Sequence, residues 1–198
     1  MILGTGMSTI QEVKQAIKII KMEENNQIIT LHCTTNYPCP IEDVNLNAMS
    51  TMKKELGCLV GYSDHTLGIL VPIMAVALGA CVLEKHFTID RKLPGPDHKA
   101  SLEPDELKNM IKQTRDAEKA LGSYDKKPTE KEKNIMRLVR KSIVAKKDIK
   151  KGTIIDKDML TIKRPGTGLT PVEIDKIIGM KTKRDITKDE VLQYDMVG

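Results

Sequence analysis

Residues 58–88 read CLVGYSDHTLGILVPIMAVALGACVLEKHFT, and this stretch decides the fold. Two short apolar runs, 58–60 and 80–83, each lead into a polar cluster, and an apolar segment with the length of a crossover helix joins them. A strand, a helix and a second strand in this order predict two neighbouring parallel strands. Both polar clusters then emerge at the carboxyl edge of one sheet, which is where α/β folds place their chemistry.

The two polar clusters are matched, because each one contains a histidine beside an acidic residue. His65 follows Asp64 in the first cluster, and His86 follows Glu84 by two residues in the second. Neutral imidazoles from adjacent strand ends, beside such carboxylates, could ligate a divalent metal. The alternative is a pair of hydrogen-bonded structural histidines, but the matched positions at two strand ends favour a functional site.

The first 123 residues predict four successive strand–helix units. A capping box within 8–12 starts the first helix, and Gly57 is suited to end a second helix over 46–56 in the left-handed conformation. Pro104 fits the first turn of a helix that runs to Leu121. This order predicts an α/β fold, either half of an eight-stranded barrel or a small open sheet. The four expected strands lie near 1–4, 28–34, 58–63 and 80–86.

A second unit is expected over 137–198, after a charged, proline-containing linker at 124–136. Its segment 147–160 recurs as 184–197, with five identical residues. Each copy is too short to bury a core by itself. We therefore expect the two copies to pair into one compact, mostly β domain with pseudo-two-fold symmetry.

Composition excludes several classes of protein. The chain has 198 residues, of which 40% are hydrophobic, so it can bury a core. Its longest apolar run, 67–80, is too short to span a bilayer, and no charged-then-apolar signal segment opens the chain, which predicts a cytoplasmic protein. The four cysteines form no CxxC motif, so we expect buried, reduced thiols.

Charge is unevenly distributed along the chain. Residues 126–198 contain 19 lysines and arginines against 11 acidic residues, whereas 1–125 contain 13 against 16. A basic region of this kind could bind nucleic acid. Its only aromatic residue is Tyr194, however, so stacking platforms for bases are missing. A basic face beside an anionic substrate or a partner subunit explains the charge equally well.

Five motifs, in this combination and order, resemble the sialic acid synthase family, which includes N-acetylneuraminate, legionaminate and pseudaminate synthases. The resemblance covers essentially the whole chain. It implies that 1–123 are the second half, strands five to eight, of a TIM-type (β/α)8 barrel. It also implies that 137–198 form the family's antifreeze-like (SAF, β-clip) domain. The motifs are LHCTTNYP at 31–38, GYSDHT at 61–66, LEKHFT at 83–88, PGPDH at 94–98 and KRPGTG at 163–168.

The resemblance implies a reaction and a cofactor. The family condenses phosphoenolpyruvate with an open-chain N-acetylated amino sugar, such as N-acetylmannosamine or a related 6-deoxy sugar, to a nonulosonic acid, and phosphate is released. His65 and His86 would hold a divalent metal, manganese first and magnesium or cobalt as alternatives. The metal would polarise the sugar aldehyde as a Lewis acid. Glu84 would lie near the metal, as ligand support or as an acid or base.

Substrate contacts are implied in the same way. Two hydroxyls would bind phosphate or carboxylate oxygens, and an aromatic and an acidic side chain would line the sugar pocket. An arginine of the SAF domain would reach the partner's site in a domain-swapped homodimer. One further threonine falls where relatives carry asparagine or serine. Thr5 and Ser63 are the two hydroxyls, and Tyr37 and Asp97 line the sugar pocket. Arg164 is the arginine of the SAF domain, and Thr35 is the further threonine.

The chain departs from the family in one respect, because the family's barrel begins well before residue 1. The glutamate and lysines that the family contributes from its earlier strands are absent. We therefore expect a part of a longer protein that is inactive alone, with Val60, Val76 and Val82 partly bared at the open barrel half. The alternative is a non-catalytic sugar- or partner-binding module derived from such a synthase.

Overall fold

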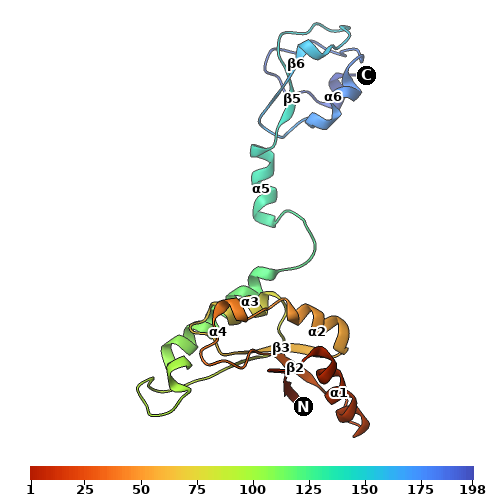
Figure 1. Cartoon of the computed structure of the whole chain (residues 1–198). Helices are drawn as coiled ribbons and strands as arrows, with labels where there is room; N and C mark the ends of the chain where they lie inside the picture. The colour runs from red at the N-terminus through yellow and green to blue at the C-terminus, as the bar shows by residue number, and fades with distance from the viewer. The chain divides into compact units, whose positions relative to one another are not determined.

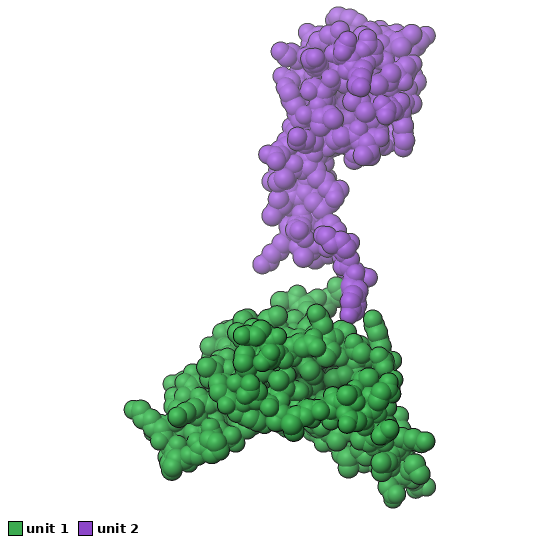
Figure 2. All heavy atoms as spheres, viewed as in Figure 1, with its two compact units in different colours: residues 1–123 green, residues 124–198 purple.

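The computed structural model describes residues 1–198 and divides them into two compact units, Met1–Ser123 and Tyr124–Gly198 (Figure 2). The stretch 124–136, which the sequence predicts to be a linker, begins at the boundary between the two units. It contains the first part of helix α5, Glu130–Val139. The helix forms there because Thr129 caps its amino terminus and Glu132 returns the bond to the backbone of Thr129, an arrangement that satisfies two otherwise unpaired N–H groups.

Unit 1 is built on a parallel four-stranded sheet with the order β1-β2-β3-β4. The sheet is curled, and the helices cover its convex face, as expected for half of a barrel (Figure 1). The predicted strands are thus confirmed, with shorter bounds. They are β1 (Ile2–Gly4), β2 (Ile29–His32), β3 (Leu59–Asp64) and β4 (Leu83–Lys85).

The helices of unit 1 begin and end where local chemistry predicts. Thr9 and Glu12 form the capping box of the first helix, and Gly57 ends the second with a φ of 61°. None of the helices combines the length and the apolar character that crossing a bilayer requires. The helices are α1 (Ile10–Met22), α2 (Ala48–Leu56), α3 (Leu70–Ala77) and α4 (Pro104–Leu121), with 3-10 turns η1 (Ile41–Asp43) and η2 (His98–Ala100).

The two faces of the sheet differ in burial. Val60 and Tyr62 face the helices and are each 1% exposed within the core that α1, α2 and α3 complete. The other face carries Ile2, Ile29 and Leu59, which the strand register places in one row. Ile2 is 57% exposed and Leu59 is 61% exposed. An apolar row therefore lies bare on the concave face.

This arrangement corrects the expectation about which residues an open barrel half exposes. Val60 and Val76 were expected to be partly bared, but both are buried. Val60 belongs to the core between sheet and helices, and Val76 lies on α3, which packs against α4. Val82 alone is partly exposed. The thiols also differ from expectation, because Cys39 is buried whereas Cys81 is exposed.

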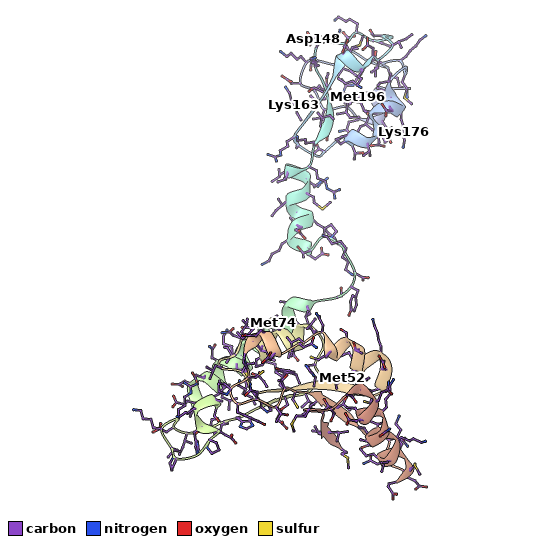
Figure 3. The ribbon with its side chains drawn as sticks, viewed as in Figure 1. Met52, Met74, Asp148, Lys163, Lys176 and Met196 are labelled. Atoms are coloured by element: carbon purple, nitrogen blue, oxygen red, sulfur yellow. The ribbon has the colours of Figure 1, made fainter.

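Unit 2 has its own core and little regular structure. Strands β5 (Ser142–Ala145) and β6 (Leu160–Lys163) pair antiparallel. Met196 lies in the core, whereas Asp148, Lys163 and Lys176 lie at the surface (Figure 3). The remaining elements are α6 (Ile174–Ile177) and the 3-10 turns η3 (Lys157–Met159), η4 (Pro171–Glu173) and η5 (Tyr194–Met196).

The two repeat copies pair reciprocally, as the sequence predicts. Ile149 and Ile186, which are equivalent positions, exchange backbone hydrogen bonds of 2.8 and 2.9 Å. The Asp148 carboxylate accepts from the backbone N–H of Lys188, and the equivalent Asp185 accepts from the N–H of Lys151. These bonds of one copy therefore have counterparts in the other, which is the pseudo-two-fold arrangement expected of the SAF-like unit.

Candidate active site

The tips of β3 and β4 are aligned by the strand register. Ser63 lies opposite Glu84, and Asp64 lies opposite Lys85. Because successive side chains of a strand point to opposite faces, the first pair lies on the concave face and the second on the helix-covered face. The Ser63 hydroxyl donates a 2.7 Å hydrogen bond to the Glu84 carboxylate.

The two predicted histidines lie together at the carboxyl edge of the sheet. The rings of His65 and His86 are 5.3 Å apart between centroids and meet edge to face. His65 is 7% exposed, and its Nδ1 lies 2.8 Å from the carbonyl oxygen of Thr34. A carbonyl only accepts hydrogen bonds, so Nδ1 carries a proton. The other ring nitrogen, Nε2, lies 3.5 Å from the Ser63 hydroxyl oxygen.

This donor set fits a divalent metal held by two imidazoles. Metal-ligating histidines usually donate their other ring N–H to a carbonyl or carboxylate, which is what His65 does toward Thr34. No group of three or more His, Cys, Asp or Glu side chains is assembled here. The sequence reasoning that set Asp64 beside the histidines needs correction, because Asp64 points to the opposite face and pairs with Lys85.

Tyr37 covers both histidine rings. Its ring centroid lies 4.1 Å from that of His65 and 5.3 Å from that of His86. The side chain remains 44% exposed. Burial, followed by the nearby acidic groups of Asp97 and Glu84, raises the pKa of the Tyr37 phenol above its ordinary value. The phenol therefore stays protonated at neutral pH and can donate a hydrogen bond to a ligand.

Asp97 approaches the site from the loop that follows β4. Its carboxylate lies 3.7 Å from Nδ1 of His86. The Ser101 hydroxyl holds the backbone of this loop by donating a 2.7 Å hydrogen bond to the carbonyl of Asp97. The sequence grouped Asp97 with Tyr37, and the structure brings both beside the histidines.

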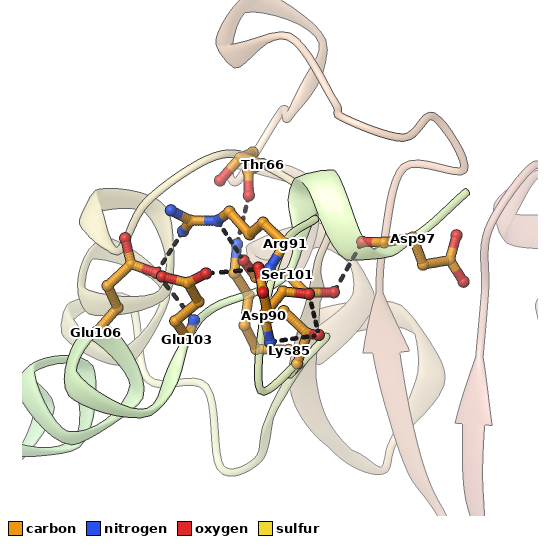
Figure 4. A network of polar contacts seen from close by, with 9 residues as sticks. Thr66, Lys85, Asp90, Arg91, Asp97, Ser101, Glu103 and Glu106 are labelled. Atoms are coloured by element: carbon orange, nitrogen blue, oxygen red, sulfur yellow. Dashed lines mark hydrogen bonds and ion pairs between the residues drawn. The ribbon is translucent and has the colours of Figure 1, made fainter. Parts of the chain in front are cut away.

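Arg91 braces the same loop through several hydrogen bonds, as Figure 4 shows. Its backbone N–H donates to Glu103 and its Nε donates to the carbonyl of Ser101, each over 3.0 Å. Its guanidinium also pairs with Glu106, and that hydrogen bond holds the pKa of the Glu106 carboxyl below its ordinary value. The loop that carries Asp97 is thus tied to the start of α4.

The remaining predicted hydroxyls are less free than the sequence suggested. The Thr5 hydroxyl is buried and donates a 2.8 Å hydrogen bond to the carbonyl of Leu31, so its proton is not available to a phosphate. Thr35 is exposed, and its hydroxyl occupies the space that a Cβ at position 6 would need. Thr35 thus lies directly against this turn, and a side chain at position 6 would require the Thr35 hydroxyl to move.

Arg164 belongs to unit 2 and lies at the exposed tip that follows β6. Its Nε donates a 2.9 Å hydrogen bond to the carbonyl of Val139. Gly166 follows closely, and a Cβ there would approach Arg140 to 2.6 Å. The tip is therefore closely packed at its base while the Arg164 side chain stays exposed.

Comparison with known proteins identifies the family. The sequence model of the NeuB family matches residues 1–126, and that of the SAF domain matches residues 140–198. The chain belongs to the NeuB family. The resemblance read from the five motifs is thereby confirmed, and so is the fold class, half of an α/β barrel with a SAF domain.

Curated relatives and solved structures agree with this assignment. N,N'-diacetyllegionaminic acid synthase of Legionella pneumophila is 48% identical over 100% of this chain and 56% of its own length. N-acetylneuraminate-9-phosphate synthase of Homo sapiens is 39% identical over 100% of this chain and 55% of its own length. The crystal structure of N-acetylneuraminic acid synthetase of Leptospira borgpetersenii, in complex with citrate, is 39% identical with a TM-score of 0.62, over 67% of this chain and 46% of that one. The chain thus spans little more than half the length of the two curated synthases.

Sequence reasoning missed two residues that organise this NeuB-family site. Lys85 received no role, although it stands between Glu84 and His86 as Asp64 stands between Ser63 and His65. Asp64 and Lys85 carry opposite charges at equivalent positions of the two strand ends, and this signal could have identified Lys85. Arg91 carried no such signal, because its partners Glu103 and Glu106 lie at the amino terminus of helix α4.

Proposed function

We propose that this chain is part of a synthase that condenses phosphoenolpyruvate with an open-chain N-acetylated amino sugar to a nonulosonic acid, with release of phosphate. One observation carries the proposal. His65 and His86 meet at the carboxyl edge of the half-barrel, with Tyr37 against both rings. The relatives of this chain include legionaminic, pseudaminic and N-acetylneuraminate-9-phosphate synthases, and this supports the class of product.

The residues of this chain would share the work as follows. A divalent metal, manganese first and magnesium or cobalt as alternatives, would be held by His65 and His86 and would supply Lewis-acid polarisation of the sugar aldehyde. The Tyr37 phenol donates a hydrogen bond to the sugar, and Asp97 accepts from its hydroxyls. Glu84, oriented by Ser63, accepts a proton from the water that adds to the oxocarbenium carbon.

A non-catalytic sugar-binding module is the second candidate. The observation that favours it is the engagement of two hydroxyl protons expected for phosphate binding. Thr5 donates to Leu31 and Ser63 donates to Glu84. Such a module would bind an N-acetylated sugar but would leave phosphoenolpyruvate intact, so an assay of phosphate release separates the two candidates.

The test uses this chain joined to the residues encoded upstream of it, so that the barrel is complete. We expect phosphate release with manganese only when phosphoenolpyruvate and N-acetylmannosamine, or a 6-deoxy relative, are both present. One phosphate should appear for each nonulosonic acid formed. Phosphate release that does not require a sugar would contradict the condensation. Sugar binding without any phosphate release would establish the second candidate.

Arg164 gives a further prediction, for the domain-swapped homodimer that we propose for the complete protein. Arg164→Lys should raise the sugar KM by roughly tenfold, because losing a charge-assisted hydrogen bond costs about 1.5–3 kcal/mol and lysine lacks the planar fork. Metal content should not change. The matched control is Arg140→Lys, a neighbouring exposed arginine. An unchanged sugar KM in Arg164→Lys would reduce its role to the bond with Val139.

A further inference from the structure

A fully buried ion pair lies behind the two histidines. Lys85 Nζ is 2.6 Å from the Asp64 carboxylate, and the two side chains are 3% and 0% exposed. The second Asp64 oxygen accepts from the Thr66 backbone N–H at 3.1 Å and from the Tyr62 hydroxyl at 3.4 Å. Lys85 Nζ also donates to the carbonyl of Thr66, a contact visible in Figure 4.

These bonds hold the residues on both sides of His65 in the sequence. Asp64 precedes it and Thr66 follows it, and both are held by Lys85, which directly precedes His86. One ammonium group therefore fixes the backbone on either side of the first histidine relative to the strand that carries the second. The hydrogen bond between Ser63 and Glu84 is the corresponding link on the concave face.

The pair is poorly explained as a device for stability alone. Taking two charges out of water is costly, and apolar side chains of similar volume often serve as well or better. The ion pair between Lys14 and Glu55 in the same unit avoids this cost, because its side chains are 38% and 40% exposed. A buried pair with good geometry does restrict the backbone that it joins, which is useful where two ring positions must be fixed.

We propose that Lys85 and Asp64 are positioning residues that set the separation and orientation of His65 and His86 for one shared metal ion. This inference rests on the proposed function, in which both imidazoles hold the metal. Neither Lys85 nor Asp64 touches the metal or a substrate. They act through the backbone of Thr66 and through the β3–β4 register.

The test compares matched pairs of substitutions in the 198-residue chain. Asp64→Asn/Lys85→Met removes both charges together, keeps an oxygen for the Thr66 N–H, and deletes the link from β4 to the Thr66 carbonyl. Lys14→Met/Glu55→Gln makes the same chemical change at the exposed pair. Co²⁺ is the probe, because imidazole sites bind it more tightly than Mn²⁺, and its visible absorption reports binding.

We expect Co²⁺ to bind about 10–100-fold more weakly to Asp64→Asn/Lys85→Met, the range seen when outer contacts of metal ligands are removed. The circular dichroism spectrum should be unchanged, and the Lys14→Met/Glu55→Gln variant should bind as the original chain does. Equal affinity in all three chains would overturn the proposal. If the first pair reduces the folded fraction, Asp64→Leu/Lys85→Met replaces it under the same criteria.

A second measurement separates this inference from the metal site itself. If the original chain binds no Co²⁺, the metal assignment fails, and nitrogen-15 spectra of the histidine rings then decide the positioning role. The Nδ1–H of His65, bonded to Thr34, should exchange slowly in the original chain. In Asp64→Asn/Lys85→Met this signal should broaden or vanish. A sharp, unshifted ring signal in that variant would show that the buried pair does not position His65.

Discussion

In the longer protein that contains the whole barrel, we expect His86→Ala to abolish metal-dependent turnover. We expect kcat/KM to fall on the order of a thousandfold or more, because Lewis-acid stabilisation is worth several kcal/mol and each 1.36 kcal/mol is a factor of ten. His86 is the better of the two sites for this test. Its side chain is 30% exposed, so the substitution leaves no buried cavity, whereas His65 is buried.

The measurement pairs phosphate-release kinetics with metal analysis of the purified protein. His98→Asn is the matched control, because His98 lies in the same loop region but bonds to Thr88 at 2.8 Å and not to the other histidines. That variant should keep its metal and most of its turnover. Full activity in His86→Ala, with an unchanged metal stoichiometry, would remove His86 from the metal site.

Residues 1–198 by themselves should give no phosphate release above background, and an upstream half expressed separately should restore it. The sheet of unit 1 has two edge strands, β1 and β4, and only the residues directly after β4 gain a partner, through the bridge between Phe87 and Leu102. Such edges tend to associate. Ile2 and Leu59 are also bare on the concave face. Covering each contributes ~1.5–3 kcal/mol, a large share of a domain's net stability of roughly 5–15 kcal/mol.

Urea denaturation of the chain with and without the upstream half provides the second readout. Unit 1 should gain cooperativity and a higher midpoint when the half is added. Unit 2 should unfold alike in both samples, because its core, around Ile143 and Ile177, is its own. Turnover by the 198-residue chain alone, at a rate comparable to the complete protein, would show that the family's upstream lysines and glutamate are dispensable.

The elements of the half-barrel could be predicted because their signals are local. The capping box of Thr9 and Glu12, the left-handed Gly57 and the first-turn Pro104 each satisfy backbone groups within a few residues. The internal repeat was equally readable, since its two copies are similar in sequence. Pairing Ile149 with Ile186 required only that two short halves share one core.

The faces of the strands could not be predicted, because β3 shows no hydrophobic alternation. LVGYSD mixes apolar and polar residues on both sides, so the sequence did not reveal that Val60 faces the helices while Leu59 faces the open side. The same ambiguity misplaced Asp64. A one-residue difference in position along a strand moves a side chain to the opposite face, and this separates Asp64 from Glu84.

Side chains alternate between the two faces of the sheet at the ends of β3 and β4, and this alternation disfavours pairing of the two strands in the wrong register. If β4 paired with β3 one residue out of step, Asp64 and Lys85 would lie on opposite faces, and each charge would lose its partner. An uncompensated buried charge costs about 3–5 kcal/mol, which is enough to make the shifted sheet rare. The correct alignment is also the one that brings His65 beside His86. The free-energy cost of a mispaired charge thus favours the one register in which the two histidine rings lie side by side.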